Sequence, residues 1–296
     1  MSDRVAVILV NYNGWKDTIE CLKSLEKVQY DNFEVVVVDN NSTDNSVAEI
    51  EKFQTTTNLT MTVIVHDENV GFAAGNNIGL RYVLNNDSDY FLFLNNDTIV
   101  DKYLFNNLLK PFKNTNVGAT IGKIYYADEP SKIWYAGGEL KFNLMKPSHN
   151  DFNEEETEII HETREVSFAT GCCLCCSSKC VSSVGEWSED YFLYEEDVDY
   201  SIRIVNAGFK VVYISDAVIY HKVSSSTSAI SNISQIYQVR NRMILINKYL
   251  SGIQKYLASL YTIALYVNRI RLREYTLSNV INGLKAYKNG ETGRHI

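Results

Sequence analysis

A cluster of acidic residues near position 196 is the part of the sequence best suited to acid–base chemistry. Glu195, Glu196, Asp197 and Asp199 lie within five positions. Carboxylates packed together are difficult to ionise at once, which raises the pKa of at least one of them toward the range useful to a general base. The alternative interpretation is a solvated helix start, where acidic residues are common because they complement the helix dipole. The cluster predicts a base only in combination with other site residues.

A second group of polar side chains follows four apolar runs, at the points where strands are expected to end. Asn11-Tyr-Asn-Gly follows the first run, Asp39 the second, residues 66–75 the third, and Asn95-Asn96-Asp97 the fourth. In an open α/β sheet, ligands bind beyond the carboxyl ends of the strands. The carboxylate of Asp97 suits Mg²⁺ or Mn²⁺, hard cations that also bind diphosphate oxygens. The series therefore predicts a ligand site with a divalent cation at this edge of the sheet.

Two common nucleotide motifs are absent from the sequence at these strand ends. No predicted strand is followed by the pattern GxGxxG, which disfavours a nicotinamide or flavin site. The turn Gly71-Phe-Ala-Ala-Gly75 lacks the Lys-Ser/Thr pair of a nucleotide-triphosphate loop. A phosphate-bearing ligand therefore needs another kind of site. Asp97 indicates one in which a cation neutralises the charge that builds on a departing nucleoside diphosphate.

Apolar runs rich in β-branched residues alternate with helical patterns over the first hundred residues. Such runs are typical of strands buried on both faces of a parallel sheet. The alternation predicts a doubly wound sheet with helices on both faces. We predict strands over residues 5–10, 33–38, 61–65 and 90–94, and helices over 15–27, from 42 or 43 through 50, and over 76–84.

The pattern is looser after residue 100. From residue 233 onward the chain is expected to be helical, with a break near Ser251-Gly252. We therefore predict an α/β domain over residues 1–230, which contains the ligand site, and a basic helical extension over residues 231–296. Between these parts we predict strands over 117–126, 165–176 and 210–214, a strand or hairpin over 133–140, an acid-rich loop over 150–165, and a helix over 191–207 closed by Gly208.

Charge is distributed unevenly along the chain. The net charge is −8, yet residues 240–296 contain ten Lys or Arg against two Glu, so this tail carries +8 and the preceding residues −16. Such a tail suits an anionic surface, either phospholipid or a phosphate-bearing acceptor; the alternative is an ordinary basic solvent face. The longest apolar stretch, residues 256–267, is shorter than the ~20 residues of a membrane span. No signal peptide opens the chain, so we expect a cytoplasmic protein whose tail is suited to docking at the inner face of the cell membrane.

Five of the six cysteines lie close together, at positions 172, 173, 175, 176 and 180. Their spacing differs from the C-x2-C turns of zinc sites. The stretch has the pattern of a strand, in which alternate side chains point to opposite faces and split such a cluster. We therefore predict that these thiols pack in the core. A thiol-based metal or redox module is the alternative, which stoichiometric zinc in the purified protein would support.

Several stretches, in order along the chain, resemble the family 2 glycosyltransferases, and most closely their bacterial and archaeal rhamnosyltransferase-type branch. The N-terminal stretches are VILVNYNG (7–14), VVVVDNNSTDNS (35–46), NVGFAAGNNIG (69–79) and FLFLNNDTIV (91–100). Residues 191–221, 237–242 and 282–294 resemble the second block and the tail of that branch. The resemblance covers essentially the whole chain. It implies the GT-A fold, an α/β class with a Rossmann-like, doubly wound mixed sheet and a C-terminal helical appendage.

The resemblance also implies which residues bind the donor, a nucleotide-diphosphate sugar. Asp39 is expected to accept a hydrogen bond from N3–H of uracil or thymine, and its alternative role is a helix N-terminal cap. Gly71 and Gly75 let the backbone approach the nucleoside closely. Arg240 lies in a block where an arginine approaches the diphosphate, although a basic residue on a helix is usually a surface charge. The predicted donor set is Asn11, Tyr12, Asn13, Asp39, Asn69, Gly71, Gly75, Asn76, Asn95, Asn96 and Arg240.

For the catalytic and metal residues, the resemblance implies Asp197 as the general base, with Glu196 beside it. Asn95-Asn96-Asp97 stands where the family often has Asp-x-Asp, so Asp97 is the acidic metal ligand that remains. An amide oxygen is a weaker metal partner than a carboxylate, which predicts modest affinity for Mg²⁺ or Mn²⁺. His221 is the predicted second ligand, with a structural role as the alternative.

Together these features predict an inverting glycosyltransferase that transfers a sugar from a dTDP- or UDP-sugar to an acceptor hydroxyl during polysaccharide or cell-surface glycan assembly. Rhamnose is one candidate sugar. The expected partners are the donor and a glycan or lipid-linked acceptor, and no nucleic acid. The alternative is a non-catalytic nucleotide-sugar-binding scaffold of the same fold, which loss of Asp97 or Asp197 would favour; both are present. The sequence leaves the donor sugar, the acceptor, the linkage and the oligomeric state open.

Overall fold

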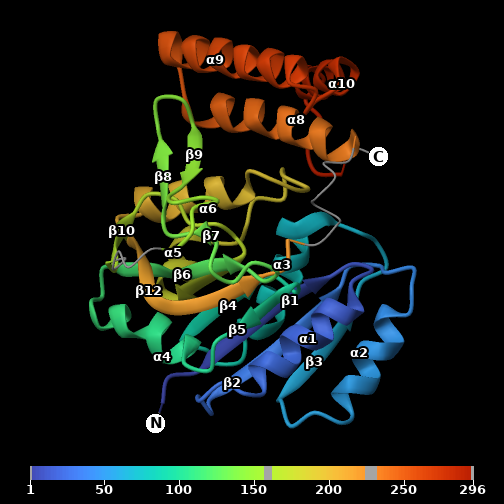
Figure 1. Cartoon of the computed structure of the whole chain (residues 1–296), viewed down its shortest axis with the longest axis vertical. Helices are drawn as coiled ribbons and strands as arrows, with labels where there is room; N and C mark the ends of the chain where they lie inside the picture. Colours follow the sequence, from blue (N-terminus) through green and yellow to red (C-terminus); the bar gives the residue numbers. More distant parts are fainter. Residues whose placement is uncertain (1, 157–161, 224–231, 295–296) are drawn as a thin grey trace.

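The computed structural model describes residues 2–156, 162–223 and 232–294, and a large mixed β-sheet lies at its centre (Figure 1). The strands are β1 (Val5–Asn11), β2 (Phe33–Asp39), β3 (Met61–Val65), β4 (Tyr90–Leu94), β5 (Thr98–Val100), β6 (Val117–Tyr126), β7 (Ile133–Tyr135), β8 (Gly138–Lys141), β9 (Lys146–His149), β10 (Arg164–Val166), β11 (Cys173–Ser177) and β12 (Lys210–His221). β8 and β9 form a separate hairpin.

The order of strands confirms the predicted fold class. Within the described residues the order in the large sheet is β10-β12-β6-β11-β4-β1-β2-β3, with β5 paired to β12 and β7 to β6. β1, β2, β3 and β4 are parallel, whereas β11 is antiparallel to both of its neighbours, β4 and β6. The parallel register places Asn11 opposite Asp39, so the polar residues that follow β1 and β2 emerge side by side.

Helices flank the sheet and continue beyond it as a C-terminal extension (Figure 1). They are α1 (Trp15–Leu25), α2 (Ser46–Gln54), α3 (Gly71–Val83), α4 (Leu104–Leu109), the 3-10 helix η1 (Lys110–Lys113), α5 (Ser178–Val184), α6 (Glu196–Asn206), α8 (Asn232–Tyr249), α9 (Gly252–Arg271) and α10 (Leu277–Lys288). The extension has the predicted break at Ser251-Gly252 and a second break, not predicted, between α9 and α10. The predicted domain boundary, at residues 230 and 231, lies outside the described residues. Nowhere in the described ranges is a helix both long and apolar enough to span a bilayer.

The parallel strands are apolar on both faces because helices cover both faces. Residues 5–9 and 35–38 are at most 1% exposed. α3 lies so close to the sheet that a Cβ added to Gly79 would lie 2.6 Å from a methyl carbon of Ile8. α1 covers the opposite face of β1 (Figure 1). The strands of this half of the sheet therefore need continuous apolar runs and not an alternation of apolar and polar residues.

α6 begins at Glu196 and not at Tyr191, so the predicted start of this helix is wrong. The residues before it, Tyr194 and Glu195, have positive φ angles of 72° and 75°. A right-handed helix excludes that conformation, so the helix has to start after these residues. Glu195 is therefore the residue before the helix, and Glu196 is the first residue of α6.

Other element boundaries also differ from the prediction. β12 continues to His221 because its second half pairs with β5 and β6. The predicted strand over 165–176 is two short strands, β10 and β11, with different neighbours. α2 begins at Ser46, a few residues later than expected, and α3 begins at Gly71, a few residues earlier than expected. The predicted loop over 150–165 lies partly outside the described residues.

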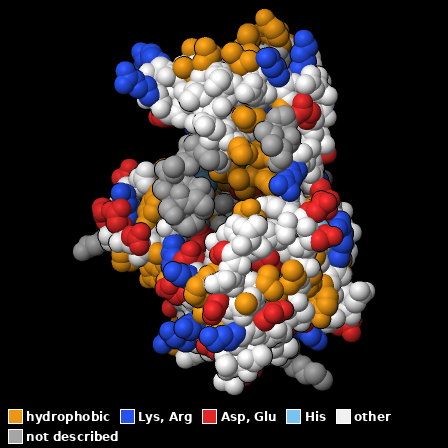
Figure 2. Space-filling model, turned by 90° about the vertical axis from the view of Figure 1, so that its right-hand side faces the viewer, with side chains coloured by type: hydrophobic (Ala, Val, Ile, Leu, Met, Phe, Trp, Pro, Cys, Tyr) orange, Lys and Arg blue, Asp and Glu red, His pale blue; other side chains and the backbone are white. Residues whose placement is uncertain are grey.

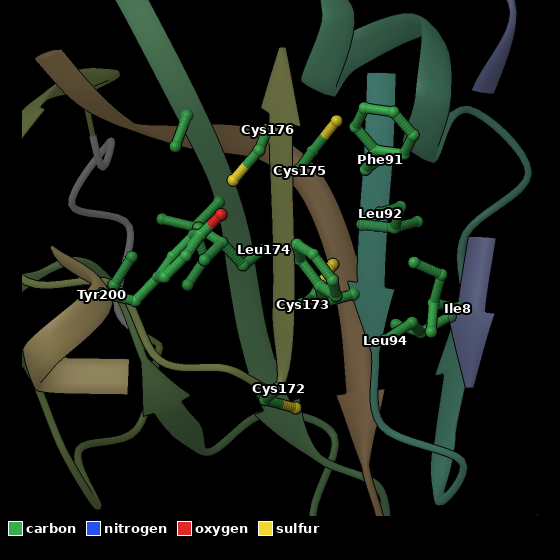
Figure 3. Close-up of a cluster of buried hydrophobic side chains, with 14 of the residues drawn as sticks. Ile8, Phe91, Leu92, Leu94, Cys172, Cys173, Leu174, Cys175, Cys176 and Tyr200 are labelled. Carbon is green, nitrogen blue, oxygen red and sulfur yellow. The ribbon is translucent and has the colours of Figure 1, made fainter. Parts of the chain in front are cut away.

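The cysteine-rich strand β11 is part of the core, as predicted. Cys175 and Cys176 point to opposite sides of the sheet, among large apolar side chains (Figure 3). All six cysteines are free and buried, and burial raises the pKa of the Cys175 thiol to about 12. A thiol with so high a pKa stays protonated and poorly reactive. Within the described residues, no group of three or more His, Cys, Asp or Glu is arranged to hold a metal, so the thiol-metal alternative finds no site there.

Asp199 links α6 to the helical extension. Its carboxylate is fully buried and accepts hydrogen bonds from Arg203 Nε at 2.8 Å, from Lys248 Nζ at 2.7 Å and from the Tyr249 hydroxyl at 2.8 Å. Arg203 lies one turn further along α6, whereas Lys248 and Tyr249 end α8. The two cations offset the desolvation of the carboxylate. Asp199 is therefore the structural member of the acidic cluster.

We expect Asp199→Asn to lower the free energy of unfolding by about 2–3 kcal/mol, because it leaves Arg203 and Lys248 without their shared anion. Urea unfolding followed by circular dichroism measures the change. Asp67→Asn is the matched control, since the Asp67 side chain is 95% exposed and should leave the midpoint unchanged. Equal midpoints for the two variants would show that Asp199 does not hold α6 to α8.

Candidate active site

The residues that follow β1 and β2 form one buried hydrogen-bonded unit. Asn11 is fully buried, and its Nδ2 donates to Asp39 Oδ1 at 2.7 Å and to the Ser42 hydroxyl at 3.1 Å. Asp39 also accepts from the hydroxyl and the backbone N–H of Ser42, at 2.7 and 2.9 Å. Asp39 therefore closes the turn after β2 and does not cap α2, whose N-cap is Asn45. Three protein donors leave part of the acceptor capacity of this carboxylate unused.

The loop after β1 is fixed by Asn13 and leaves its neighbour exposed. Asn13 has a left-handed φ of 53°, and its Oδ1 accepts the backbone N–H groups of Thr43 and Asp44 at 2.7 and 3.2 Å. Tyr12 is 49% exposed. A cavity of about 320 Å³ adjoins the loop and is lined by Asn13, Gly14, Trp15, Lys16, Asp17 and Asp44. Asn13 thus shapes the loop, and Tyr12 is accessible to a ligand.

A glycine turn brings the start of α3 to the same edge of the sheet. Asn40 Nδ2 donates to Asn69 Oδ1 and to the Gly71 carbonyl, both at 3.1 Å. Gly71 has a φ of +85°, and a Cβ added there would lie 2.2 Å from the carbonyl oxygen of Phe192. The position therefore requires glycine. This turn starts α3 and fixes Asn69 beside the polar ends of β1 and β2.

Gly75 and Asn76, predicted to bind the donor, lie in the first turns of α3. A Cβ added to Gly75 would lie 2.9 Å from Val10, so the glycine allows α3 to pack on β1. Asn76 is 1% exposed, and its Nδ2 donates to the Phe72 carbonyl at 3.0 Å. Both residues position the helix, and their contact with a donor stays a prediction.

Three polar residues follow β4, and their side chains have different surroundings. Asn96 Nδ2 donates to the Thr18 hydroxyl at 2.8 Å and lies 3.4 Å from Asn11 Oδ1, so it braces the loop after β1. The Asn95 side chain is half-buried and has no hydrogen-bond partner among the described residues. The third residue, Asp97, points away from this network toward β12.

Asp97 and His221 meet where the ends of β4 and β12 converge. Asp97 Oδ1 lies 3.1 Å from His221 Nε2, and the two residues are 9% and 6% exposed. A carboxylate oxygen and an imidazole nitrogen at this separation are a donor set that suits Mn²⁺; Mg²⁺ prefers oxygen ligands throughout. Two protein ligands leave the remaining coordination positions to water or a diphosphate. The pair therefore fits the predicted cation site.

Asp197 lies in the first turn of α6, with Glu196 beside it. Asp197 Oδ2 accepts the Gly171 N–H at 3.3 Å, and its Oδ1 accepts the Val198 N–H at 2.9 Å. Burial raises the pKa of Asp197, and these N–H groups act in the opposite direction. Burial, together with the charge of Asp197, holds the pKa of Glu196 well above its usual range. The pair therefore contains carboxylates that take up a proton more readily than exposed ones.

Glu195 is paired with a cation from α8. Its Oε1 lies 2.7 Å from Arg242 Nη2, and burial nevertheless raises the pKa of Glu195 to about 7. Glu195, Glu196 and Asp197 line a cavity of about 580 Å³ between the β8–β9 hairpin, the start of α6, and helices α8 and α9. The other lining residues are Pro147, Ser148, His149, Phe152, Phe168, Tyr194, Val198, Gln238, Arg242, Leu265, Tyr266 and Arg269.

One backbone segment connects the predicted cation site with this cavity. The Asn95 N–H donates to the Cys172 carbonyl at 2.8 Å, and the Gly171 N–H donates to Asp197. Residues 170–172 therefore hydrogen-bond both to the strand end that carries Asp97 and to the start of α6. The predicted metal ligand and the predicted base lie at the same edge of the sheet.

Three residues of this region were not predicted from the sequence. The Trp134 ring packs between two imidazoles, with ring centroids 4.7 Å from His149 and 4.8 Å from His221. Burial lowers the pKa of His149. Arg242, the partner of Glu195, stands two residues after the predicted Arg240. No spacing in the sequence indicates these residues, because the hairpin and α8 join the site through tertiary contacts.

Arg240 is buried within the C-terminal extension. Its Nε donates to Asn241 Oδ1 at 2.9 Å and its Nη2 to the Gly293 carbonyl at 2.8 Å. Next to Gly293, Arg294 Nη1 donates to the Asn69 carbonyl at 3.3 Å. A contact between Arg240 and a diphosphate therefore stays a prediction. Arg294 is the arginine that the structure places beside the predicted donor loop.

Several glycosyltransferases are related to this chain in sequence. It is 24% identical over 266 residues to the dTDP-rhamnosyl transferase RfbF of Shigella flexneri, covering 84% of this chain and 81% of RfbF. It is 29% identical over 136 residues to the glycosyltransferase GlyG of Streptococcus pneumoniae, covering 46% of this chain and only 44% of GlyG. A stretch of 64 residues is 38% identical to an N-acetylglucosaminyl-diphospho-decaprenol L-rhamnosyltransferase of Mycobacterium tuberculosis, covering 22% of this chain and 21% of that protein.

Solved structures of glycosyltransferases share the fold. The mannosyltransferase PcManGT from Pyrobaculum calidifontis, in complex with GDP-Man and Mn²⁺, superimposes with a TM-score of 0.63 at 15% identity, covering 97% of this chain and 88% of that chain. Residues 1–349 of S. aureus TarS, in complex with UDP-GlcNAc, give a TM-score of 0.62 at 17% identity, covering 97% and 81%. At these identities the likeness establishes the fold, which is GT-A.

The family model that matches this chain is described as Glycosyl transferase family 2. It spans residues 6–179, which is more than half of the chain and includes the strand ends with Asn11, Asp39 and Asp97. This chain therefore belongs to glycosyl transferase family 2.

Proposed function

We propose that this chain is an inverting glycosyltransferase of the cytoplasm, which moves a sugar from a dTDP- or UDP-sugar to an acceptor hydroxyl during assembly of a polysaccharide or cell-surface glycan. The observation that carries the proposal is the segment 170–172, which hydrogen-bonds to the strand end before Asp97 and to Asp197. A cation-binding carboxylate and a basic carboxylate at one edge of the sheet suit leaving-group stabilisation and acceptor deprotonation in one displacement.

The nucleoside binds across the ends of β1 and β2. Asp39 accepts three protein hydrogen bonds and retains capacity for the N3–H of uracil or thymine; cytosine has no proton at N3 to donate. The Asn95 amide, without a partner among the described residues, binds the ribose. Exposed Tyr12 and the glycine turn at Gly71 border the same space.

Asp97 and His221 are the residues that would hold a divalent cation, Mn²⁺ or Mg²⁺, for the donor diphosphate. When bound, the cation neutralises the negative charge that builds on the departing nucleoside diphosphate. The Mn²⁺ in the solved structure of PcManGT supports a divalent cation at the donor. Arg294 adds a positively charged side chain next to Asn69 in the predicted donor loop.

The acceptor occupies the 580 Å³ cavity, with its hydroxyl at Asp197. Asp197 takes the hydroxyl proton as the acceptor oxygen bonds to the anomeric carbon and the bond from that carbon to the diphosphate breaks. Attack from the face opposite the leaving group inverts the configuration. The raised pKa of Asp197 makes it a stronger base than an exposed aspartate, which favours this role.

dTDP-rhamnose is the donor that we favour. RfbF, which this chain matches over most of both lengths, is a dTDP-rhamnosyl transferase. The solved neighbours bind GDP-Man, UDP or UDP-GlcNAc, so a panel of donors is needed to test the choice.

Donor binding tests the Asp97–His221 site. We expect one of dTDP-rhamnose, UDP-galactose, UDP-glucose and UDP-N-acetylglucosamine to bind selectively with Mn²⁺ or Mg²⁺, as measured by calorimetry. Asp97→Ala should weaken that binding about tenfold or more, as should a chelator, because the cation that would neutralise the diphosphate is lost or held less tightly. Asp216→Ala, which changes an exposed aspartate on β12, should bind like the parent. A parent that binds none of the four donors would contradict the transferase proposal.

Removal of the base separates binding from chemistry. We expect Asp197→Asn to lower kcat by about 10²–10⁴-fold, since the amide cannot accept the hydroxyl proton, while the affinity for the donor is retained. Asp216→Asn serves as the control for the same chemical change at an exposed position. Transfer at the parent rate by Asp197→Asn would exclude Asp197 as the base. A parent that binds donor but transfers to no acceptor would favour the non-catalytic scaffold.

The pH dependence of transfer follows from the raised pKa of Asp197. Protonated Asp197 cannot accept a proton, so kcat/KM should rise with pH, with an inflection above the usual aspartate value of about 3.9, and level off at higher pH. Initial rates over a series of buffers give the profile, and donor affinity in the same buffers is the control. An inflection that appears in donor affinity alone would assign the titration to the donor site.

A further inference from the structure

α9 has an apolar face that no other described part of the chain covers. It lies at the end of the molecule opposite the N-terminus, with α8 between it and the sheet (Figure 1). Its exposed large apolar residues recur at helical spacing, so they share one side of the helix. They are Ile253, Tyr256, Leu257, Leu260, Ile263 and Val267, each at least 42% exposed, and we call them the outer face of α9.

The opposite side of α9 is packed against the protein. Ala258, Thr262 and Tyr266 are buried, and the Tyr266 hydroxyl donates to the Gln238 carbonyl of α8 at 3.1 Å. Leu265 and Tyr266 line the cavity that contains Asp197. The outer face is therefore not needed to hold α9 in place, and its exposure to water is unfavourable. A contiguous apolar surface of this kind indicates a binding surface.

Positive charges flank the outer face. Arg271 ends α9, Arg273 follows it in the turn to α10, and Lys285 and Lys288 are exposed on α10. Within the described residues, none of these four side chains has an ion-pair partner. Apolar side chains beside Lys and Arg are also grouped at this end of the molecule in the space-filling view (Figure 2). Residues before 240 carry a net negative charge, so a net positive charge is found only in the segment from residue 240 onward.

We infer that the outer face of α9 docks on an anionic phospholipid bilayer, with the helix lying in the plane of the interface. Apolar side chains enter the acyl boundary, and the flanking Arg and Lys contact lipid phosphates. Pairing of the outer face with a second copy is less well suited, because a two-fold contact repeats the same cations on both sides. The cavity with Asp197 lies under the inner side of α9, so an acceptor held in the bilayer reaches the base; this last step rests on the proposed function.

Flotation with vesicles tests the inference on the full-length protein. We expect the parent to float with phosphatidylcholine vesicles that contain about 30% phosphatidylglycerol, and to bind pure phosphatidylcholine at least about tenfold less. Leu260→Glu should reduce binding to the anionic vesicles about tenfold or more. Leu84→Glu is the matched control: Leu84 and Leu260 are 45% and 46% exposed, but Leu84 lies away from α9 and its variant should float like the parent.

Other outcomes would overturn the inference. Absence of parent binding to anionic vesicles, or equal binding by Leu260→Glu, would exclude docking through the outer face. A dimeric mass in light scattering without vesicles, reduced to a monomer by Leu260→Glu, would assign the face to a second copy. Donor binding by Leu260→Glu, measured in parallel, should equal that of the parent. This readout reports folding and is independent of the bilayer, so failure of docking is distinguishable from failure of the proposed transfer.

Discussion

The position of the proposed base depends on a left-handed turn that α8 holds in place. Tyr194 and Glu195 both have positive φ angles, which costs about 1 kcal/mol or more for each residue. Asn241 Nδ2 donates to the carbonyls of Leu193 and Tyr194 at 2.9 and 3.0 Å, and Arg242 pairs with Glu195. These contacts offset the strain, and they fix where α6 starts.

Because α6 starts after that turn, four acids that are neighbours in sequence have different environments. Asp199 is neutralised by Arg203 and Lys248, and Glu195 by Arg242. Among the described residues no cation pairs with Asp197 or Glu196, and burial raises the pKa of both. The start of the helix thus separates Asp199 and Glu195, which are paired with cations, from Glu196 and Asp197.

The features of the sequence that predicted the fold are local. Apolar runs and helical spacing reproduced the parallel half of the sheet, and the strand register then brings Asn11 to Asp39. The alternation of strand side chains likewise predicted that the cysteines are split between two faces. Such patterns suffice where one element and its immediate neighbours determine the environment.

Features that depend on distant contacts were missed. The start of α6 depends on Asn241, some fifty residues away, and nothing near Tyr194 in the sequence signals a left-handed turn. For the same reason Arg242 and not Arg240 reaches the cavity, since the packing of α8 decides which side of the helix faces α6. The resemblance named the block that contains both arginines, but only the structure distinguishes their contacts.

The helical extension is therefore part of the site and not only attached to it. Without α8, the turn before α6 would lose its hydrogen bonds, and Glu195 would be a buried carboxylate without a cation. α9 packs on α8 through Tyr266, which also lines the cavity. Binding of a membrane to the outer face of α9 would therefore act on the same helices that position Asp197. Direct contacts thus connect the proposed membrane surface to the proposed base.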